Sequence, residues 1–351
     1  MKRVFFPFRK TIIFLTAFGL FLSGCQSPAP SIPPAPTGTA SPVPTETVAP
    51  TPTNTVLPTF TPEAAWYQQL DPSLGVLRFH YAQVTNSKAR IYVSLDDAVA
   101  STGNSGPLEN YPAYVAYTTR KTVDGHDYYL TNYGWMKGDD LQDLTPSSFT
   151  GLQITRPVTF RFGWVLSETQ SVNSAGLPVQ TYERYQVVHE VPAGSTRDGF
   201  VAIGADEWLP EKSVALVDPV VPQEAGQVCR FIYVSLAHQT LSVYEGCKLV
   251  FATLISSGKN SYTFEGRFAI LYKDQPYSVI TPPAGSPNDY YIEGVPYFMS
   301  YTSTSFGFHG AYWHDSFGSP ASHGCINLAP ADAHWLYDWA YLGDYVFISQ
   351  N

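Results

Sequence analysis

Short runs of alternating apolar and polar residues dominate the chain from Trp66 to about Pro219. Tyr, Val, Phe and Ile runs are broken by Gly, Asn, Asp and Pro, and long helical periodicities are few. This pattern is typical of strands, because successive side chains of a strand point to opposite faces of its sheet. The sequence therefore predicts that this region is all β.

A β-hairpin is predicted in residues 229–247, where alternating apolar positions lie on both sides of a polar tip. If Leu236 pairs with Thr240, the register of the whole hairpin is fixed. That register sets Cys229 opposite Cys247, at a separation close to that of a disulfide. We predict a disulfide between them. Two free thiols are the alternative, since a register can slip by one residue.

One helix is predicted near the C-terminal end of the chain. Residues 330–342 start with Pro330 in the first turn, carry Asp332 near the positive end of the helix dipole, and are followed by Gly343 as a stop. Residues 345–348 are then predicted to form a last strand. The C-terminal region is therefore expected to be mainly β, with one short helix.

The first 24 residues have the order of a signal peptide: basic residues, an apolar stretch at 11–22, and then Leu22-Ser23-Gly24-Cys25. The apolar stretch is shorter than the roughly 20 residues that span a bilayer. Leu-Ser-Gly-Cys resembles the bacterial lipobox, which implies cleavage before Cys25 and lipid on that residue. An ordinary signal peptide with an incidental Cys25 is the alternative.

Residues 25–64 form a Pro/Thr/Ser-rich linker that is too poor in apolar residues to build a core. We therefore expect an exported protein that is lipid-anchored to the outer face of the cell membrane and faces the cell wall. The chain contains 20 Lys and Arg residues against 29 Asp and Glu residues. No basic tract follows the signal peptide, which argues against nucleic acid as a partner.

Two stretches of the β region, 125–141 and 198–214, are similar to each other. Each has an aromatic pair or run, a polar turn, a Trp followed by Met or Leu, and a short polar segment. Both resemble the closing hairpin of bacterial SH3-like barrels, which implies one or two small SH3-like modules. One irregular β-domain, with Trp135 and Trp208 as ordinary core residues, is the alternative.

The strongest chemical signal lies in residues 306–328, which hold His309-Gly310, a loop, and Ser322-His323-Gly324-Cys325-Ile326-Asn327. A thiol with a pKa near 8.5 is only slightly ionised at neutral pH, so a nucleophilic cysteine needs a neighbouring base or cation. His309 is the candidate base for Cys325. The backbone amides around Gly324 and Cys325 are candidates to hold an oxyanion. A zinc site made of these side chains is the alternative, although the usual ligand spacings are missing.

This compound pattern resembles the L,D-transpeptidase (YkuD-type) family, whose mark is a His-Gly, a loop, and Ser/Thr-His-Gly-Cys followed by an apolar residue and Asn or Arg. The resemblance implies that Cys325 is the nucleophile, with His309 as the base and His323 orienting the loop or the carbonyl pocket. The implied loop-support residues are Gly310, Ser322, Gly324 and Asn327, and the implied groove residues are Tyr312 and Trp313. The chain departs from the family's Thr-Pro-x-Gly at 263–266, where it reads Thr-Phe-Glu-Gly.

The resemblance also implies a β-sandwich catalytic domain and a reaction. Cys325 would attack the third residue of a peptidoglycan stem peptide, release the terminal D-Ala, and pass the acyl group to an amine, without a cofactor or a metal. Carbapenem-type β-lactams are the expected inhibitors. An L,D-carboxypeptidase and a non-catalytic wall-binding lipoprotein are the alternatives. The predicted order is signal peptide 1–24, linker 25–64, β modules 65–147 and 148–220, and catalytic domain 221–351.

Overall fold

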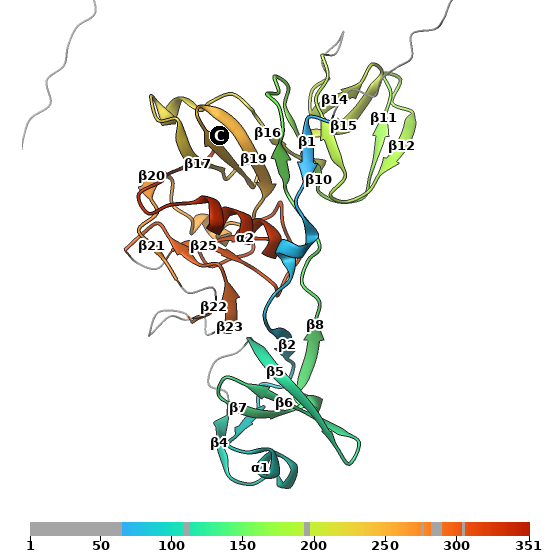
Figure 1. Ribbon diagram of the computed structural model, residues 1–351. Coiled ribbons are helices and arrows are strands. Elements are labelled where there is room, and N and C mark those ends of the chain that lie inside the picture. Colours follow the sequence, from blue (N-terminus) through green and yellow to red (C-terminus); the bar gives the residue numbers. More distant parts are fainter. Residues whose placement is uncertain (1–64, 108–111, 193–196, 275–276, 282–289, 304–305) are drawn as a thin grey trace, which may run out of the picture. The chain divides into compact units, whose positions relative to one another are not determined.

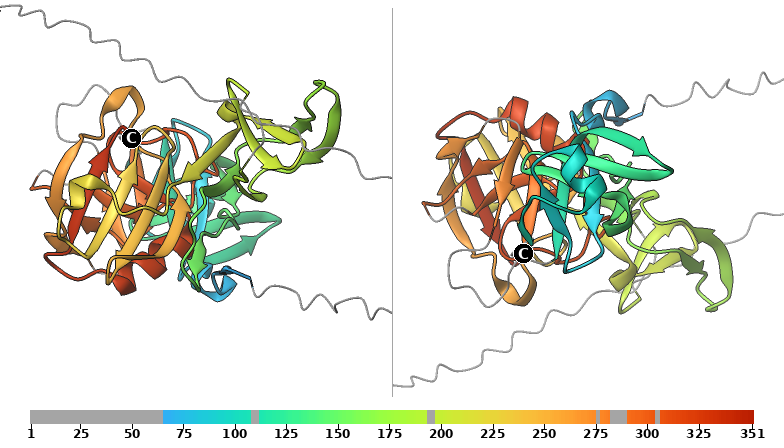
Figure 2. Two further views of the ribbon diagram at one scale, coloured as in Figure 1. Left: turned by 90° about the horizontal axis from the view of Figure 1, so that it is seen from above. Right: turned by 90° about the horizontal axis from the view of Figure 1, so that it is seen from below.

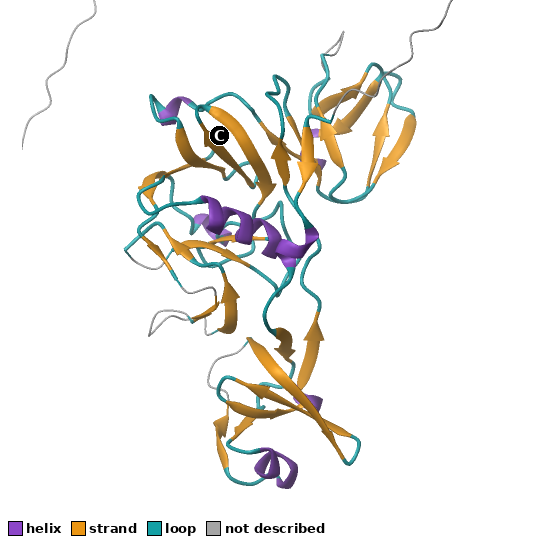
Figure 3. Ribbon diagram, in the orientation of Figure 1, coloured by secondary structure: helices purple, strands orange, loops and turns teal. Residues whose placement is uncertain are grey.

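The computed structural model describes residues 65–107, 112–192, 197–274, 277–281, 290–303 and 306–351, which all belong to one compact unit. The predicted signal peptide, linker and lipidated Cys25 lie outside these residues. Strands dominate the described residues and two α-helices accompany them, so the mainly β prediction is confirmed (Figure 3). No helix in this part of the chain is long and apolar enough to cross a membrane.

The strands between residues 80 and 144 form most of a nine-stranded sheet, along the path β22-β23-β5-β6-β7-β3-β4, with β2 pairing with β5 and β8 (Figure 1). Ala82, Val115 and Met136 lie in its small hydrophobic core. The elements are β2 (His80–Val84), β3 (Arg90–Tyr92), α1 (Leu95–Ala100), β4 (Asn104–Pro107), β5 (Ala113–Val123), β6 (His126–Thr131), β7 (Gly134–Lys137) and β8 (Leu141–Leu144). The two strands at the other end of the path, β22 (Tyr277–Ile280) and β23 (Tyr291–Pro296), come from much later in the chain.

Two small sheets follow, with the orders β13-β10-β16 and β12-β11-β15-β14. Val165, Leu209 and Leu216 belong to the core that they share. The strands are β10 (Phe162–Val165), β11 (Thr169–Val172), β12 (Pro178–Tyr182), β13 (Val187–His189), β14 (Phe200–Gly204), β15 (Glu207–Pro210) and β16 (Val214–Val217).

The two similar sequence stretches fold in the same way. In the first, the hairpin β6–β7 leads through a 3-10 turn, Gly138–Asp140, into β8. In the second, the hairpin β14–β15 leads through a 3-10 turn, Glu211–Ser213, into β16. Trp135 and Trp208 occupy corresponding places, each in the second strand of its hairpin. The likeness seen in the sequence is therefore a likeness of local structure.

A seven-stranded sheet, β1-β9-β19-β18-β17-β27-β20, forms the framework of the C-terminal region (Figure 2). Five of its strands are β17 (Arg230–Ser235), β18 (Thr240–Glu245), β19 (Lys248–Leu254), β20 (Gly266–Ala269) and β27 (Tyr345–Ser349). The other two, β1 (Tyr67–Gln69) and β9 (Leu152–Ile154), come from earlier in the chain, and β9 pairs directly with β19. The C-terminal sheet is thus completed by strands from outside residues 221–351.

The predicted hairpin forms as β17 and β18, but its register differs from the predicted one by one residue. Ser235, not Leu236, pairs with Thr240. The longer turn is possible because Gln239 adopts a left-handed φ of 51°. Cys229 and Cys247 lie just beyond the paired strands and still form a disulfide, with Cα atoms 4.2 Å apart.

The second helix, α2 (Pro330–Trp339), ends three residues earlier than predicted, and Gly343 lies in the following turn. Its first turn packs into the core, so that Asp332 is completely buried. The Asp332 carboxyl accepts hydrogen bonds from Gly151 N at 2.7 Å and from Thr253 Oγ1 at 2.5 Å. Burial raises the pKa of Asp332 to about 7.

A last small sheet, β21-β24-β25-β26, packs on the same core as α2. Its strands are β21 (Tyr272–Lys273), β24 (Met299–Ser300), β25 (Gly307–Gly310) and β26 (Ile326–Leu328). This sheet carries the candidate catalytic residues.

Candidate active site

Two short parallel strands, β25 and β26, carry His309 and directly follow Cys325, respectively. In the register of β25 and β26, Phe308 lies opposite Ile326 and His309 lies opposite Asn327. Phe308 and Ile326 point into the hydrophobic core and are 0% exposed. Because alternate residues of a strand face opposite sides, His309 and Asn327 lie on the other face. Cys325, one residue before β26, belongs to that same face.

Cys325 is a half-buried thiol that takes part in no disulfide. Burial raises its pKa to about 11, and a hydrogen bond from the backbone of Gly307 opposes part of that rise. At neutral pH the side chain is therefore a thiol rather than a thiolate. A reaction at this sulfur needs a base that accepts its proton.

His309 is buried, with 2% of its surface exposed. Its Nδ1 lies 3.1 Å from the backbone oxygen of Gly310. Since a carbonyl oxygen can only accept, Nδ1 carries the proton of the neutral ring and Nε2 keeps a lone pair. Burial lowers the pKa of His309 to about 4, so the ring is neutral at pH 7. His309 therefore has the protonation state that a general base requires.

His323 has different surroundings. It is exposed, and its ring stacks on Tyr290 with centroids 4.6 Å apart. Desolvation lowers its pKa, and the positive charge of Lys259 lowers it further. Its position beside the nucleophile fits the predicted orienting role better than the role of base.

The loop that carries the nucleophile is held by hydrogen bonds of its own. Ser322 Oγ accepts from Gly324 N at 3.0 Å and donates to Cys325 O at 2.5 Å. Thr263 Oγ1 donates to Gly324 O at 2.8 Å. Gly324 has a φ of +135°, and a Cβ there would lie 2.2 Å from the ring of Phe306, so no larger residue fits. The Gly324 N–H, one of the predicted oxyanion donors, is bonded to Ser322 Oγ in this structure.

Residues 230–348 match YkuD, the L,D-transpeptidase catalytic domain.

Solved structures similar to the chain were also found, and several are L,D-transpeptidases. The Ldtfm–avibactam carbamoyl enzyme has 27% identity over 35% of this chain and 49% of that chain, with a TM-score of 0.32. The catalytic domain of the Enterococcus faecium L,D-transpeptidase has 28% identity over 35% of this chain and 100% of that chain, with a TM-score of 0.31. An L,D-transpeptidase from Mycobacterium smegmatis has 21% identity over 57% of this chain and 90% of that chain, with a TM-score of 0.32. The chain spans about half the length of the first of these. A search of curated proteins found no match.

Within the YkuD domain, Asn327 and His314 support the face that carries Cys325. His314 Nδ1 accepts from Ser316 N at 3.1 Å, so Nε2 carries the proton of the neutral ring. Nε2 lies 2.9 Å from the Asn327 amide, whose Oδ1 is one of two buried side-chain atoms without a partner among the described residues. With the amide oxygen turned toward His314, Oδ1 accepts from Nε2–H and no longer lacks a partner. Burial lowers the pKa of His314 to about 4, which keeps this pair neutral.

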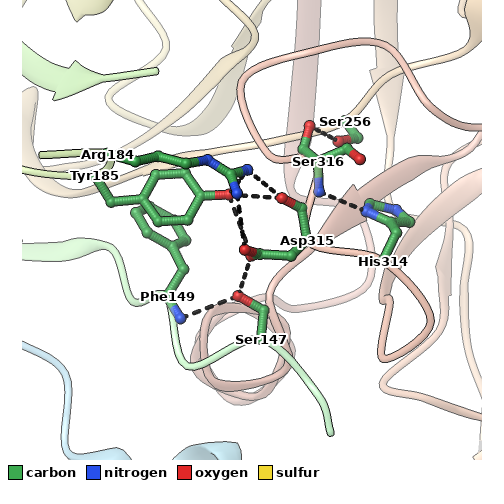
Figure 4. Close-up of polar contacts among 8 residues, drawn as sticks. All are labelled: Ser147, Phe149, Arg184, Tyr185, Ser256, His314, Asp315 and Ser316. Atoms are coloured by element: carbon green, nitrogen blue, oxygen red, sulfur yellow. Dashed lines mark hydrogen bonds and ion pairs between the residues drawn. The ribbon is translucent and has the colours of Figure 1, made fainter. Parts of the chain in front are cut away.

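Side chains from outside the YkuD domain hold the loop between the two halves of the motif (Figure 4). Asp315 forms an ion pair with Arg184 at 3.0 Å and accepts from Ser147 Oγ at 2.5 Å. Its backbone oxygen accepts from Tyr185 OH at 2.9 Å. Residue 315 directly follows His314, so these contacts fix the loop next to the His314–Asn327 pair. These partners lie too far away in the sequence for a local pattern to indicate them.

Tyr312 does not line an open groove, contrary to the prediction. It is 1% exposed, its ring stacks on Tyr81 with centroids 3.6 Å apart, and its OH donates to Glu293 O at 2.6 Å. Trp313 is partly exposed and lies 5.6 Å from His309, centroid to centroid, so it adjoins the site as predicted. The packing partner of Tyr312 comes from β2, far away in the sequence, and alternation within the motif does not reveal it.

The strand β23 is also tied to residues of the nine-stranded sheet. It pairs with β5 in parallel, with Tyr291 opposite Ala113. The buried Glu293 accepts from Ala116 N at 3.0 Å and from Tyr291 OH at 2.7 Å, and burial raises its pKa to about 7. Tyr290, which stacks on His323, directly precedes this strand. The stacking residue is thus positioned through main-chain pairing with β5.

The arrangement as a whole suits acyl transfer through sulfur. It offers a thiol that takes part in no disulfide, a neutral buried imidazole on the same sheet face, and a loop held rigidly by Ser322 and Thr263. Among the described residues, no three His, Cys, Asp or Glu side chains gather in a way that could hold a metal ion. A thiol and a neutral imidazole are groups that can take part in nucleophilic attack and proton transfer.

Proposed function

We propose that the protein is a cysteine-dependent L,D-transpeptidase that acts on peptidoglycan stem peptides. The observation that supports the proposal is a buried, neutral His309 on β25, which pairs with the strand that Cys325 directly precedes, inside a region that matches the L,D-transpeptidase catalytic domain. The expected donor is a tetrapeptide stem with a free C-terminus.

The two half-reactions follow from the protonation states. Cys325 Sγ attacks the carbonyl carbon of the third stem residue while His309 Nε2 takes the thiol proton. His309 gives that proton to the nitrogen of the departing D-Ala, and a thioester remains on Cys325. An amine of a neighbouring stem then attacks the thioester, His309 takes the amine proton, and the proton returns to the sulfur as the new amide forms.

The test is an incubation of the full chain, with Cys25→Ser to keep it soluble, with a disaccharide tetrapeptide. Mass spectrometry should show a cross-linked dimer that has lost one D-Ala. A tripeptide product instead would make the protein an L,D-carboxypeptidase. Unchanged substrate with wild-type protein would contradict the proposal. Cys325→Ala serves as the control and should give no product at all.

We also propose that lipid on Cys25 anchors the protein outside the cell membrane, with residues 26–64 as a tether. The apolar stretch before Cys25 is too short to be a comfortable membrane span, and acyl chains on one residue supply stable attachment. Cys25→Ser should move the protein from the membrane fraction to the soluble exported fraction. A variant that stays wholly in the membrane fraction would mean that the apolar stretch is retained as the anchor.

A further inference from the structure

The turn at residues 259–262 is fixed to the nucleophile loop at both ends. Before the turn, Gly258 forms a parallel bridge with Ser322, and Lys259 N donates to Ser322 O at 3.0 Å. After the turn, Thr263 Oγ1 bonds to Gly324 O at 2.8 Å and accepts from Gly258 N at 2.8 Å. Gly258 also approaches the Gly324 backbone so closely that a Cβ would lie 2.8 Å from its Cα. The turn therefore keeps a constant position relative to Cys325.

The backbone of this turn is strained. Asn260 and Ser261 are consecutive non-glycine residues with left-handed φ values of 52° and 59°. Such conformations persist where the surrounding structure enforces them, and they gather at ligand sites. Here the fixed ends enforce the strain, and its result is a tight turn whose four residues, Lys259 to Tyr262, are all exposed. A strained exposed turn beside a nucleophile points to recognition of a ligand.

The side chain of Lys259 is a cation without a counter-ion among the residues that the structure describes. None of the ion pairs or side-chain hydrogen bonds of the described residues includes its ammonium group. Two other cations of the same region have partners: Arg230 pairs with Glu245 and Asp344, and Lys273 donates to backbone carbonyls. Lys248, like Lys259, has no ion pair or side-chain hydrogen bond among the described residues. The chain as a whole has a net charge of −9, so an unpaired cation at this place is not a consequence of composition.

The charge of Lys259 is felt inside the site. Burial is the main cause of the lowered pKa values of His314 and His323, and the positive charge of Lys259 lowers both further. The same positive charge is available to an anionic ligand that approaches Cys325. An ammonium group is a compact, mobile point charge that suits a carboxylate.

We propose that Lys259 binds the C-terminal carboxylate of the acyl-donor peptide and thereby selects donors with a free terminus. This inference rests on the proposed function, since it names the group of the donor that the site recognises. The carboxylate belongs to the amino acid that leaves when Cys325 attacks the preceding carbonyl, so it lies only a few bonds from the reacting atom. Tyr262 is the last residue of the turn and Phe264 lies just beyond it. Their side chains are 49% and 59% exposed and offer apolar surface to the rest of the peptide.

The first experiment compares two donors with the full chain carrying Cys25→Ser: the tetrapeptide acid and its C-terminal carboxamide. Lys259→Met should raise KM for the acid about tenfold, the usual effect of losing one hydrogen bond to a charged group, and leave KM for the carboxamide unchanged. Lys259→Arg should restore most of the loss. Lys248→Met, an exposed lysine of the same domain, is the matched control and should behave as wild type. An equal loss on both donors would show that Lys259 only shapes the turn, and would overturn the proposal.

A second readout does not need the proposed reaction. Iodoacetate and iodoacetamide alkylate the Cys325 thiol and differ in one negative charge. The ratio of their rates should fall several-fold in Lys259→Met and stay constant in Lys248→Met. An unchanged ratio in Lys259→Met would refute an anion site at Lys259. If the ratio falls while no peptide donor reacts with wild type, the anion site stands and the proposed peptidoglycan reaction fails.

Discussion

The two imidazoles beside Cys325 have opposite surroundings. His309 is buried, and one of its ring nitrogens is bonded to a main-chain carbonyl. His323 is exposed, and its ring stacks on a tyrosine ring. Only the buried side fixes a tautomer and a neutral charge state. The exposed side carries the groups that can meet a substrate, Tyr290 and Lys259. The difference suggests that the chemistry belongs to one side of the sulfur and recognition to the other.

The comparison predicts very unequal effects of removing the two rings. His309→Ala should slow acylation of Cys325 about 1000-fold, within the range typical of a general base, while His323→Ala should slow it about tenfold or less. The measurement is the rate at which a carbapenem adds its mass to the intact protein. Similar losses in both variants would spread the base function over both rings and remove the distinction between the two sides.

The pH dependence sharpens the same point. Above a pKa of about 4, His309 is neutral and can accept the thiol proton, so wild-type acylation should be nearly flat between pH 6 and 8. In His309→Ala the reaction depends on free thiolate, and with a Cys325 pKa of about 11 its rate should rise about tenfold per pH unit over that range. Stopped-flow or mass measurements of carbapenem adducts at several pH values give both slopes. A wild-type slope equal to that of the variant would mean that His309 takes no proton.

The buried Asp332 in α2, the helix that follows β26, should make the stability of the protein depend on pH. Asp332 has a folded-state pKa of about 7, above its unfolded value, so the folded state binds the extra proton between about pH 4 and 7. Its contribution to stability is complete below about pH 4 and is lost as the pH rises through about 7. Three pKa units correspond to up to about 4 kcal/mol.

Asp332→Asn should remove the contribution of Asp332 to the pH dependence of the free energy of unfolding. Denaturant titrations between pH 4 and 8 measure that slope of free energy against pH. Asp338→Asn, on the exposed side of the same helix, should keep the slope of the wild type. An unaltered slope in Asp332→Asn would show that the proton resides elsewhere.

The smallest effect is expected on the exposed side. Tyr290→Ala removes the ring on which His323 stacks, and a stacking contact contributes about 0.5–1.5 kcal/mol, so acylation should slow by no more than about tenfold. His309 is untouched, and the pH profile should keep the wild-type form. A changed profile would mean that the exposed side also sets the charge state of the base.

Local sequence information was enough for the centre of the site. The order His-Gly, loop, Ser-His-Gly-Cys led to the prediction of His309 and Cys325, which lie on β25 and directly before its partner strand β26. The disulfide partners were also evident, although the hairpin slips by one residue at Gln239. These features depend on residues close together in the chain or on strong alternation.

The features that escaped prediction depend on distant partners. Tyr312 reads as a loop aromatic, and only its stacking on Tyr81 from β2 makes it a core residue. In the sequence, nothing near Asp315 indicates a partner for its charge. In the structure, Arg184 pairs with its carboxylate and Tyr185 bonds to its backbone oxygen. The Gly324 amide reads as a free donor until the Ser322 side chain turns back to it. Neither burial nor a three-dimensional hydrogen bond can be inferred from spacing alone.

The pairing of β9 with β19 has a practical consequence for anyone who wishes to cut the protein down to its catalytic part. Removal of everything before residue 221 would leave β19 paired with β18 alone. Its other neighbour, β9, would be lost, so that Gln153 and Leu152 no longer lie opposite Phe251 and Ala252. Unpaired amide and carbonyl groups along an apolar strand are a template for another chain. A minimal fragment is therefore expected to self-associate edge to edge, and a soluble one should retain β9 or carry a charged substitution on the outer strand.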